Sequence, residues 1–208
     1  KPMFETLGIL DTVEFNRLDP FYTVRYPDFE MAVPADIDLY LARFGEIFPE
    51  ELAGAKNMFE AIRRIGHDVA RFTKDRSSGV RVQQHEMMEQ YPDMAMAFAS
   101  SWADFVDRFL DSDEAKALVT TLWGYLGLPP SRLSAGQFAL TLLSYHTAGA
   151  WYPTGGSGRM TWAIAEAIEE DGGQVLLRTK VTAVQPTSGG VTVSTEKGPR
   201  VDARAVVS

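Results

Sequence analysis

The sequence predicts an α+β fold, in which a cluster of helices with one β-hairpin precedes a smaller part made of a helix, a strand and an antiparallel meander. Most of the chain before Gly149 carries apolar side chains at helical spacing. Residues 181–184, 191–195 and 200–201 instead alternate like strands, with glycine-containing turns between them. We place the boundary near Gly149, which gives one domain over residues 1–148 and another over residues 149–208.

The first domain is predicted to begin with a β-hairpin. Residues 21–26 and 29–33 are rich in aromatic and β-branched side chains, and Pro27-Asp28 between them has the chemistry of a turn. Asp36 can then cap a helix that reaches about Phe48, because its carboxylate can accept a hydrogen bond from a backbone N–H of the first turn.

Further helices are expected in the rest of this domain. Pro49 suits the first position of a helix that extends as far as Lys74, because that position needs no N–H. Aromatic side chains from Phe98 to Phe109 lie at helical offsets, a pattern typical of a buried core. Two capping-box pairs predict helices over residues 112–125 and 135–145. The pairs are Asp111 with Glu114 and Ser134 with Gln137.

The second domain is predicted to open on a glycine-rich turn that lets another group approach the backbone closely. Gly155 and Gly156 lack a Cβ, and a helix with one apolar face begins near Met160. Gly172-Gly173 is placed to end that helix, and residues 174–177 are predicted to form a short buried strand. The turn is not a Rossmann phosphate loop, because it lacks Gly-x-Gly-x-x-Gly after a hydrophobic strand.

The composition excludes several classes of function. The net charge of -8 opposes binding to a phosphate backbone, so no nucleic-acid partner is expected. The chain has no cysteine, and its three histidines are far apart in sequence, so neither thiolate chemistry nor a metal site is expected. No Gly-x-Ser-x-Gly elbow is present, and no segment approaches the ~20 apolar residues of a transmembrane helix.

Five residues near the boundary are candidates for binding a substrate: Tyr145, His146, Trp151, Tyr152 and Arg159. Aromatic side chains beside flexible glycines could line a hydrophobic pocket, to which His146 or Arg159 would add a polar contact. In the alternative interpretation, Trp151 and Tyr152 only pack between the domains, and His146 is a hydrogen-bonded, partly buried residue.

Several segments resemble a family of flavin enzymes. The resemblance is carried by Tyr152-Pro153-x-Gly155-Gly156, Gly172-Gly173-x-Val175 and Lys180-Val181-x-x-Val184. They are similar to segments of the flavin-dependent superfamily of phytoene desaturases, carotenoid isomerases and retinol saturases, to which monoamine oxidases are more distantly related. Residues 48–51 and 127–134 resemble the carotenoid isomerase and retinol saturase branch in particular.

The resemblance implies that the FAD-binding domain is split along the sequence. In such enzymes the dinucleotide loop lies near the N-terminus and the flavin-ring contacts near the C-terminus, and neither is expected in this chain. Residues 1–148 would be an inserted substrate-binding domain, and residues 149–208 a partial FAD-binding domain. The chain is therefore expected to be an internal part of a longer protein, inactive alone.

The resemblance also implies roles for individual residues. Val181 matches the valine whose backbone pairs with the adenine of FAD. Gly155 and Gly156 belong to a segment that matches the Gly-Gly-Ser-Gly of monoamine oxidases, and Arg159, which follows it, is implied to face the substrate. Monoamine oxidases carry glutamine at that position, and an arginine would repel a cationic amine.

We therefore expect an FAD-dependent oxidoreductase that desaturates, saturates or isomerises a long hydrophobic polyene or isoprenoid lipid. The alternatives are a flavin amine oxidase and a non-catalytic module that binds a hydrophobic ligand. The flavin would carry out hydride transfer, so the helical domain needs mainly to orient an apolar chain and exclude water. The expected partner is a hydrophobic small molecule, and the expected location is the cytoplasm, with peripheral contact to a membrane.

Overall fold

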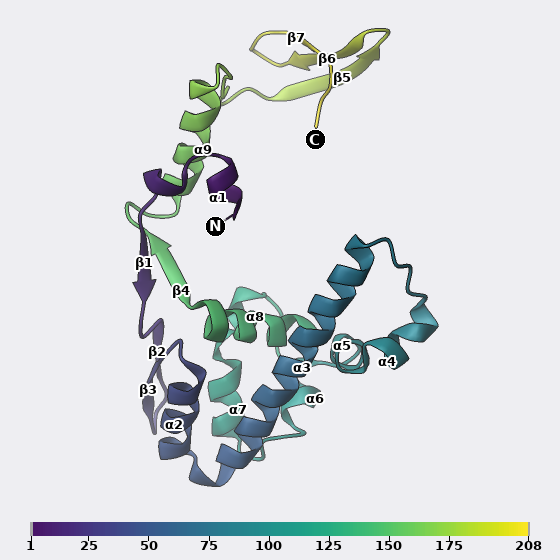
Figure 1. Ribbon diagram of the computed structural model, residues 1–208. Coiled ribbons are helices and arrows are strands. Elements are labelled where there is room, and N and C mark those ends of the chain that lie inside the picture. Colours follow the sequence, from purple (N-terminus) through teal and green to yellow (C-terminus); the bar gives the residue numbers. More distant parts are fainter. Residues whose placement is uncertain (1, 208) are drawn as a thin grey trace. The chain divides into compact units, whose positions relative to one another are not determined.

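The computed structural model describes residues 2–207, which divide into two compact units (Figure 1). We call residues 16–152 the helical unit, and residues 2–15 with residues 153–207 the mixed unit. Helices and small antiparallel sheets occur together, in agreement with the predicted α+β class. The helical unit ends at residue 152, close to the predicted boundary near Gly149. Residues 2–15 belong to the same unit as residues 153–207, whereas the sequence analysis placed them in the first domain. The roles assigned to the two domains stay predictions.

The helical unit contains the predicted β-hairpin and the first predicted helix. Strands β2 (Tyr22–Arg25) and β3 (Glu30–Val33) pair antiparallel. Helix α2 (Ile37–Ile47) begins where Asp36 accepts a hydrogen bond from the Leu39 N–H at 2.8 Å, as the cap prediction requires.

The longest helix, α3 (Leu52–Ser77), follows the 3₁₀ turn η2 (Pro49–Glu51) and packs against α5 (Pro92–Phe98) and α8 (Ala135–Ala148). Its buried face includes Met58, Ile62 and Ile65. Two glycines allow close approach on this helix. A Cβ on Gly54 would lie 1.9 Å from the Phe109 carbonyl oxygen, and one on Gly66 would lie 2.3 Å from Leu143 Cδ2.

Residues 98–109, whose aromatic side chains lie at helical offsets, do not form one helix. The structure has short helices instead, because two hydrogen bonds from a distant segment interrupt the helical ladder: Ala135 N–H donates to Ser100 C=O at 3.0 Å, and Trp102 N–H donates to Leu133 C=O at 2.7 Å. Trp102 is fully buried, but Phe98 is 50% exposed and lies outside the core. The short helices between α3 and α7 are η3 (Gln84–Glu86), α4 (Met87–Gln90), α5 and α6 (Trp102–Val106).

The next two helices begin where the capping signals predict, with one correction. Helix α7 (Asp113–Thr120), extended by η4 (Thr121–Tyr125), is capped by Ser112 and not by Asp111. The backbone N–H groups of Asp111 and Ser112 instead donate to the carboxylate of Glu51. Ser134 caps α8 as predicted.

The mixed unit has a smaller core. Helix α1 (Pro2–Thr6), turn η1 (Leu10–Thr12) and helix α9 (Gly158–Glu170) accompany a cluster of three buried apolar residues, Ile9, Val13 and Ala163. Gly172, at φ +83°, follows the end of α9, where the sequence predicts a glycine stop. The predicted meander is present as β5 (Val181–Thr187), β6 (Gly190–Thr195) and β7 (Val201–Ala203), in the order β5-β6-β7.

Two features of the strands differ from the predictions. Residues 174–177 form no strand, since no described segment pairs with them, and Leu177 is 67% exposed. Strands β1 (Phe15–Leu18) and β4 (Ala150–Pro153) pair with each other, and the sequence analysis missed this pairing. Among residues 2–207 no helix combines the length and the apolar character needed to cross a membrane.

Candidate functional site

The candidate residues fall into two groups, one in each unit. Tyr145, His146, Trp151 and Tyr152 belong to the helical unit. Gly155, Gly156, Arg159 and Val181 belong to the mixed unit.

His146, near the end of α8, is buried among aromatic rings. Its ring lies edge-on to Tyr40 at 4.9 Å, to Phe59 at 5.5 Å and to Phe21 at 5.8 Å between centroids. Its Nδ1 lies 3.1 Å from the Ala35 carbonyl oxygen, so in the neutral tautomer that fits this contact Nδ1–H donates. Burial lowers the pKa of His146, which favours the neutral imidazole. The geometry makes His146 a hydrogen-bonded core residue, and its predicted contact with substrate stays a prediction.

Tyr145 belongs to an aromatic cluster that the sequence analysis did not assign to the site. Its ring stacks on Phe21 with 5.3 Å between centroids and 4° between planes, and it also lies 6.5 Å from Tyr125. Phe21 contacts Tyr22 edge-on at 4.7 Å. The adjacent aromatic residues in the predicted hairpin were a usable signal, but their contact with Tyr145 depends on tertiary packing.

The phenols of Tyr22 and Tyr145 stay protonated well above neutral pH. Burial, followed by the nearby Tyr125, Tyr26 and Tyr145, raises the pKa of Tyr22. Burial and Tyr125 likewise raise the pKa of Tyr145. The cluster therefore offers neutral aromatic faces with hydroxyl groups at their edges, which suit an apolar ligand that carries one polar group.

Trp151 and Tyr152 lie on β4 and are exposed. Their exposed fractions are 53% and 52%. The Trp151 indole Nε1–H donates to the Ala148 carbonyl at 2.8 Å, which fixes the ring against the end of α8. Two exposed aromatic side chains on one short strand are available to contact another molecule or another segment.

The glycine turn before α9 has the backbone conformation that the sequence predicts. Gly155 has φ +85° and Gly156 has φ +87°, a region that side chains with a Cβ rarely adopt. Arg159 lies in the first turn of α9, and its Nη1 contacts the Glu166 carboxylate oxygens at 3.0 and 3.1 Å. Its Nη2 donates to the Thr12 carbonyl at 3.3 Å. The guanidinium is thus tied to the mixed unit's own groups, and its predicted contact with substrate stays a prediction.

Val181 starts β5, which lies at one edge of the three-stranded sheet. Glu196 N–H donates to the Lys180 carbonyl at 2.9 Å, and Val181 lies opposite Thr195, just before an irregularity of register between Val181 and Ala183. Because Lys180 bonds to Glu196, the next pair, Val181 and Thr195, is of the non-hydrogen-bonded kind, and the N–H and C=O of Val181 point away from β6, toward the edge where no described strand pairs. An open main-chain edge fits a nucleotide base held by backbone hydrogen bonds, as the resemblance implies for Val181.

No group of three or more His, Cys, Asp or Glu side chains within residues 2–207 could hold a metal ion. The candidate residues therefore provide aromatic faces, close-approach glycines and a main-chain edge. This set can bind and orient a ligand, and it leaves electron transfer to a cofactor.

The comparison with protein families shows to which class of proteins the chain belongs. The whole chain, residues 1–208, matches the family described as flavin containing amine oxidoreductase, and it belongs to this family. The resemblance to flavin-dependent enzymes is thereby confirmed, and membership implies a flavin cofactor.

Curated relatives add a narrower similarity. The chain is 25% identical over 177 residues to a 4,4'-diapophytoene desaturase (4,4'-diapolycopene-forming) of Methylomonas sp, which covers 84% of this chain and 34% of the relative. It is 26% identical over 165 residues to the all-trans-retinol 13,14-reductase of Rattus norvegicus, covering 76% of this chain and 27% of the relative. A retinol 13,14-reductase of Danio rerio is 29% identical over 84 residues, 40% of this chain and 14% of the relative. The chain thus spans about a third or less of the length of these relatives.

Proposed function

We propose that the chain is part of an FAD-dependent enzyme that desaturates, saturates or isomerises a long hydrophobic polyene or isoprenoid lipid. The observation that carries this proposal is the joint similarity to a diapophytoene desaturase and to retinol 13,14-reductases. Both names describe redox chemistry at carbon–carbon bonds of apolar isoprenoids. They describe opposite directions of hydrogen transfer, so the proposal leaves the direction to experiment.

In this proposal the mixed unit helps to hold the cofactor. The outward backbone groups of Val181 would bind the adenine, while Gly155 and Gly156 would let a ligand approach the turn before α9. FAD, when bound, supplies the hydride chemistry. The chain's own residues would then bind the lipid, orient it and exclude water.

The aromatic cluster of the helical unit would contact the lipid. Tyr145 and its stacked partner Phe21 offer apolar faces, and exposed Trp151 and Tyr152 add two more. No carboxylate or imidazole needs to transfer a proton for this role, which agrees with the buried, hydrogen-bonded state of His146. The cytoplasmic location and the peripheral membrane contact belong to the same proposal, and sedimentation with vesicles would test the contact.

The decisive experiment uses the complete protein, expressed with its natural ends. It should purify with the absorbance of a bound flavin, and it should convert a diapophytoene-type polyene or retinol under anaerobic conditions with a suitable electron donor or acceptor. Mass spectrometry separates the outcomes, because desaturation removes a pair of hydrogens, saturation adds a pair and isomerisation leaves the mass unchanged.

Two results would contradict the proposal. Turnover of amines with release of hydrogen peroxide, improved by Arg159→Gln, would indicate the amine oxidase alternative, because the substitution removes a cation that repels the substrate. A folded, colourless protein that binds the lipid but ignores added FAD would indicate the non-catalytic binding module.

A further inference from the structure

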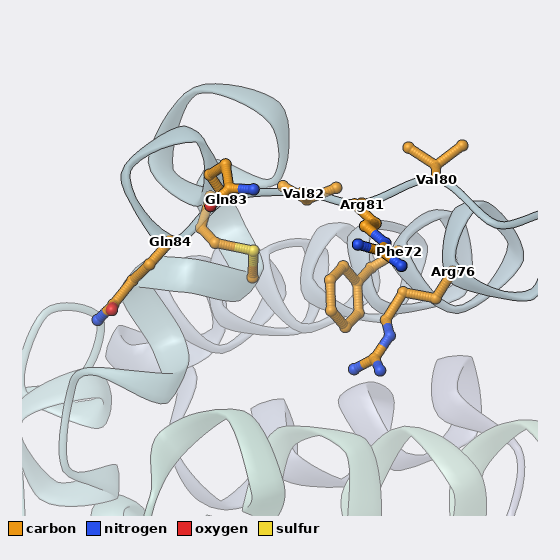
Figure 2. Close-up of a pocket in the computed structure, with 8 residues that line it drawn as sticks. Phe72, Arg76, Val80, Arg81, Val82, Gln83 and Gln84 are labelled. Carbon is orange, nitrogen blue, oxygen red and sulfur yellow. The ribbon is translucent and has the colours of Figure 1, made fainter.

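A groove with two chemically different ends lies along the C-terminal half of α3. One end is a cavity of about 500 Å³ beside the loop that follows α3, and its walls include Arg76, Arg81 and Gln83 (Figure 2). The other end is a cavity of about 370 Å³ between α3 and α5, whose walls include Val69, Met94 and Phe98. Phe72 and Met87 line both cavities, so the two are neighbours with shared walls. We call the whole the amphipathic groove.

The first end presents two positive charges. Neither Arg76 nor Arg81 forms an ion pair with any carboxylate in the part of the chain that the structure describes. Arg76 lies over the Phe72 ring at 5.8 Å, and Figure 2 shows both arginines beside that ring. Guanidinium groups bind carboxylates by paired hydrogen bonds. The charge is local, because the whole chain carries -8.

The second end is apolar. Apart from Thr73, its walls consist of aliphatic, methionine and aromatic side chains, and Phe98 at the rim is 50% exposed. A volume of about 370 Å³ falls in the range of pockets that hold small organic ligands. Apolar surface left open in this way is stabilised when a hydrocarbon covers it.

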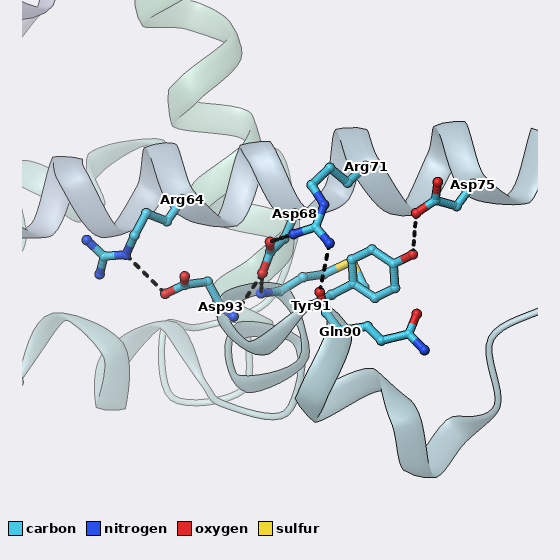
Figure 3. Close-up of polar contacts among 8 residues, drawn as sticks. Arg64, Asp68, Arg71, Asp75, Gln90, Tyr91 and Asp93 are labelled. Atoms are coloured by element: carbon cyan, nitrogen blue, oxygen red, sulfur yellow. Dashed lines mark hydrogen bonds and ion pairs between the residues drawn. The ribbon is translucent and has the colours of Figure 1, made fainter.

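Polar contacts hold the walls in place (Figure 3). Asp68 on α3 accepts hydrogen bonds from the backbone N–H groups of Asp93 and Met94 at 3.0 and 3.3 Å, at the start of α5. Tyr91 donates its hydroxyl to the Asp75 carboxylate at 2.6 Å. A groove with fixed walls loses less conformational entropy when a ligand binds.

We propose that the amphipathic groove binds one long-chain carboxylate, with the carboxylate at Arg76 and Arg81 and the alkyl chain in the apolar cavity. A neutral polyene would leave both guanidinium groups without a partner, so this ligand differs from the lipid of the proposed reaction. A concave cavity of this size fits a single chain better than a bilayer surface. The inference does not rest on the flavin chemistry.

The test is calorimetric titration of the complete protein with saturated fatty acids of increasing length, each below its micelle concentration. Affinity should rise roughly fourfold for each added methylene while the chain still fills the apolar cavity, and then level off. The alcohol of matching length should bind at least about tenfold more weakly, because it cannot form charge-assisted hydrogen bonds with the arginines.

Variants separate the two ends of the groove. Arg76→Gln and Arg81→Gln should each weaken the carboxylate by roughly tenfold and leave the alcohol unchanged, whereas Arg132→Gln, an exposed arginine elsewhere, should alter neither. Ala95→Phe should fill the apolar cavity and weaken both ligands. If Ala95→Phe proves unfolded by circular dichroism, Phe98→Ser serves in its place, because that side chain is already half exposed.

Three outcomes would overturn the inference: equal affinity for acid and alcohol, affinity independent of chain length, or binding only to vesicles of anionic phospholipid. The last outcome would make the groove a membrane contact instead. The titration measures heat and needs no flavin. An absence of fatty-acid binding would therefore not contradict the proposed function, and an absence of flavin activity would not contradict fatty-acid binding in the groove.

Discussion

His146 gives the protein a predictable response to acid. Burial lowers the pKa of His146 in the folded state, so between the folded pKa and the unfolded value of about 6.5 the unfolded chain binds the proton more readily. Its contribution to the free energy of unfolding is therefore present above about pH 6.5 and is lost as the pH falls through that window.

Urea unfolding at several pH values between about 7.5 and 5 measures this loss. His146→Gln should flatten the dependence in that window, and His85→Gln, a substitution at an exposed position, should preserve it. An unchanged pH dependence in His146→Gln would contradict the assignment.

Among the carboxylate side chains of α3, Asp68 should be the one whose removal lowers the free energy of unfolding most. It is only 5% exposed and accepts the Asp93 and Met94 N–H groups, which lose their partner in Asp68→Ala. We expect a loss of about 1–3 kcal/mol in the free energy of unfolding.

Chemical denaturation measures the effect of Asp68→Ala, with Glu60→Ala as the matched control. Glu60 pairs with Arg63 on the exposed side of α3, and such a pair contributes at most about 0.5 kcal/mol. Equal losses in the two variants would argue that Asp68 does not hold the start of α5.

The conformation and contacts of individual site residues could be predicted from the sequence only where they depend on residues nearby in the chain. The positive φ angles of Gly155 and Gly156 follow from glycine in a turn before a helix. The partner of His146 is the carbonyl of Ala35, 111 residues away, and no local pattern contains it. The stacking of Phe21 on Tyr145 has the same long-range origin.

At the scale of elements, the start of α7 depends on a carboxylate from another helix. Desolvation acts to raise the pKa of Glu51, but hydrogen bonds from the Ser112 and Asp111 N–H groups outweigh it and leave the pKa below its usual value. The stabilisation from Glu51 is therefore present above the ordinary glutamate pKa of about 4.3 and is lost as the pH falls through the lower folded value.

Glu51→Gln should cost about 1 kcal/mol at neutral pH, because the Asp111 and Ser112 N–H groups lose their charge-assisted hydrogen bonds to the carboxylate. The difference from the wild type should shrink on acidification toward about pH 3, as measured by thermal unfolding. Glu50→Gln, one residue earlier in η2, serves as the control. A difference that is constant with pH would count against stabilisation by the ionised Glu51 carboxylate.

The elements that could be predicted are those specified by neighbouring residues. Asp36 and Ser134 cap helices, and the Pro27-Asp28 turn closes the hairpin, because each needs only groups a few residues away. The helical offsets over residues 98–109 do not give one helix, because Ser100 and Trp102 form backbone hydrogen bonds with Ala135 and Leu133 at the start of α8. The strand expected at residues 174–177 fails because a strand needs a partner, and composition alone does not supply one.

At the scale of the whole chain, the two units differ in how much apolar surface they bury. The core of the helical unit includes Phe44, Met58, Ile62, Trp102 and Phe138, whereas the mixed unit buries the small cluster around Ala163. Local opening costs less where few apolar side chains are buried.

Hydrogen exchange of the 208-residue chain should therefore be faster in β5–β7 than in α3 and α8, by at least about tenfold in rate, which corresponds to ~1.4 kcal/mol of opening free energy. Peptide-resolved mass spectrometry measures this. Equal protection in both units would show that they unfold as one cooperative body. Added FAD should slow exchange around Val181 if the backbone edge binds the nucleotide.

Gly54 and Gly66 carry a consequence for any future comparison of homologous sequences. A side chain at Gly54 would collide with a backbone carbonyl oxygen, so α3 tolerates little else at that position, whereas at Gly66 it would meet only the movable end of the Leu143 side chain. Gly54 is therefore expected to be nearly invariant across species and to be depleted of variants in a deep mutational scan, and Gly66 is expected to be more tolerant. The invariance of Gly54 would reflect the spacing between backbones, and a ranking of catalytic candidates by conservation should discount it.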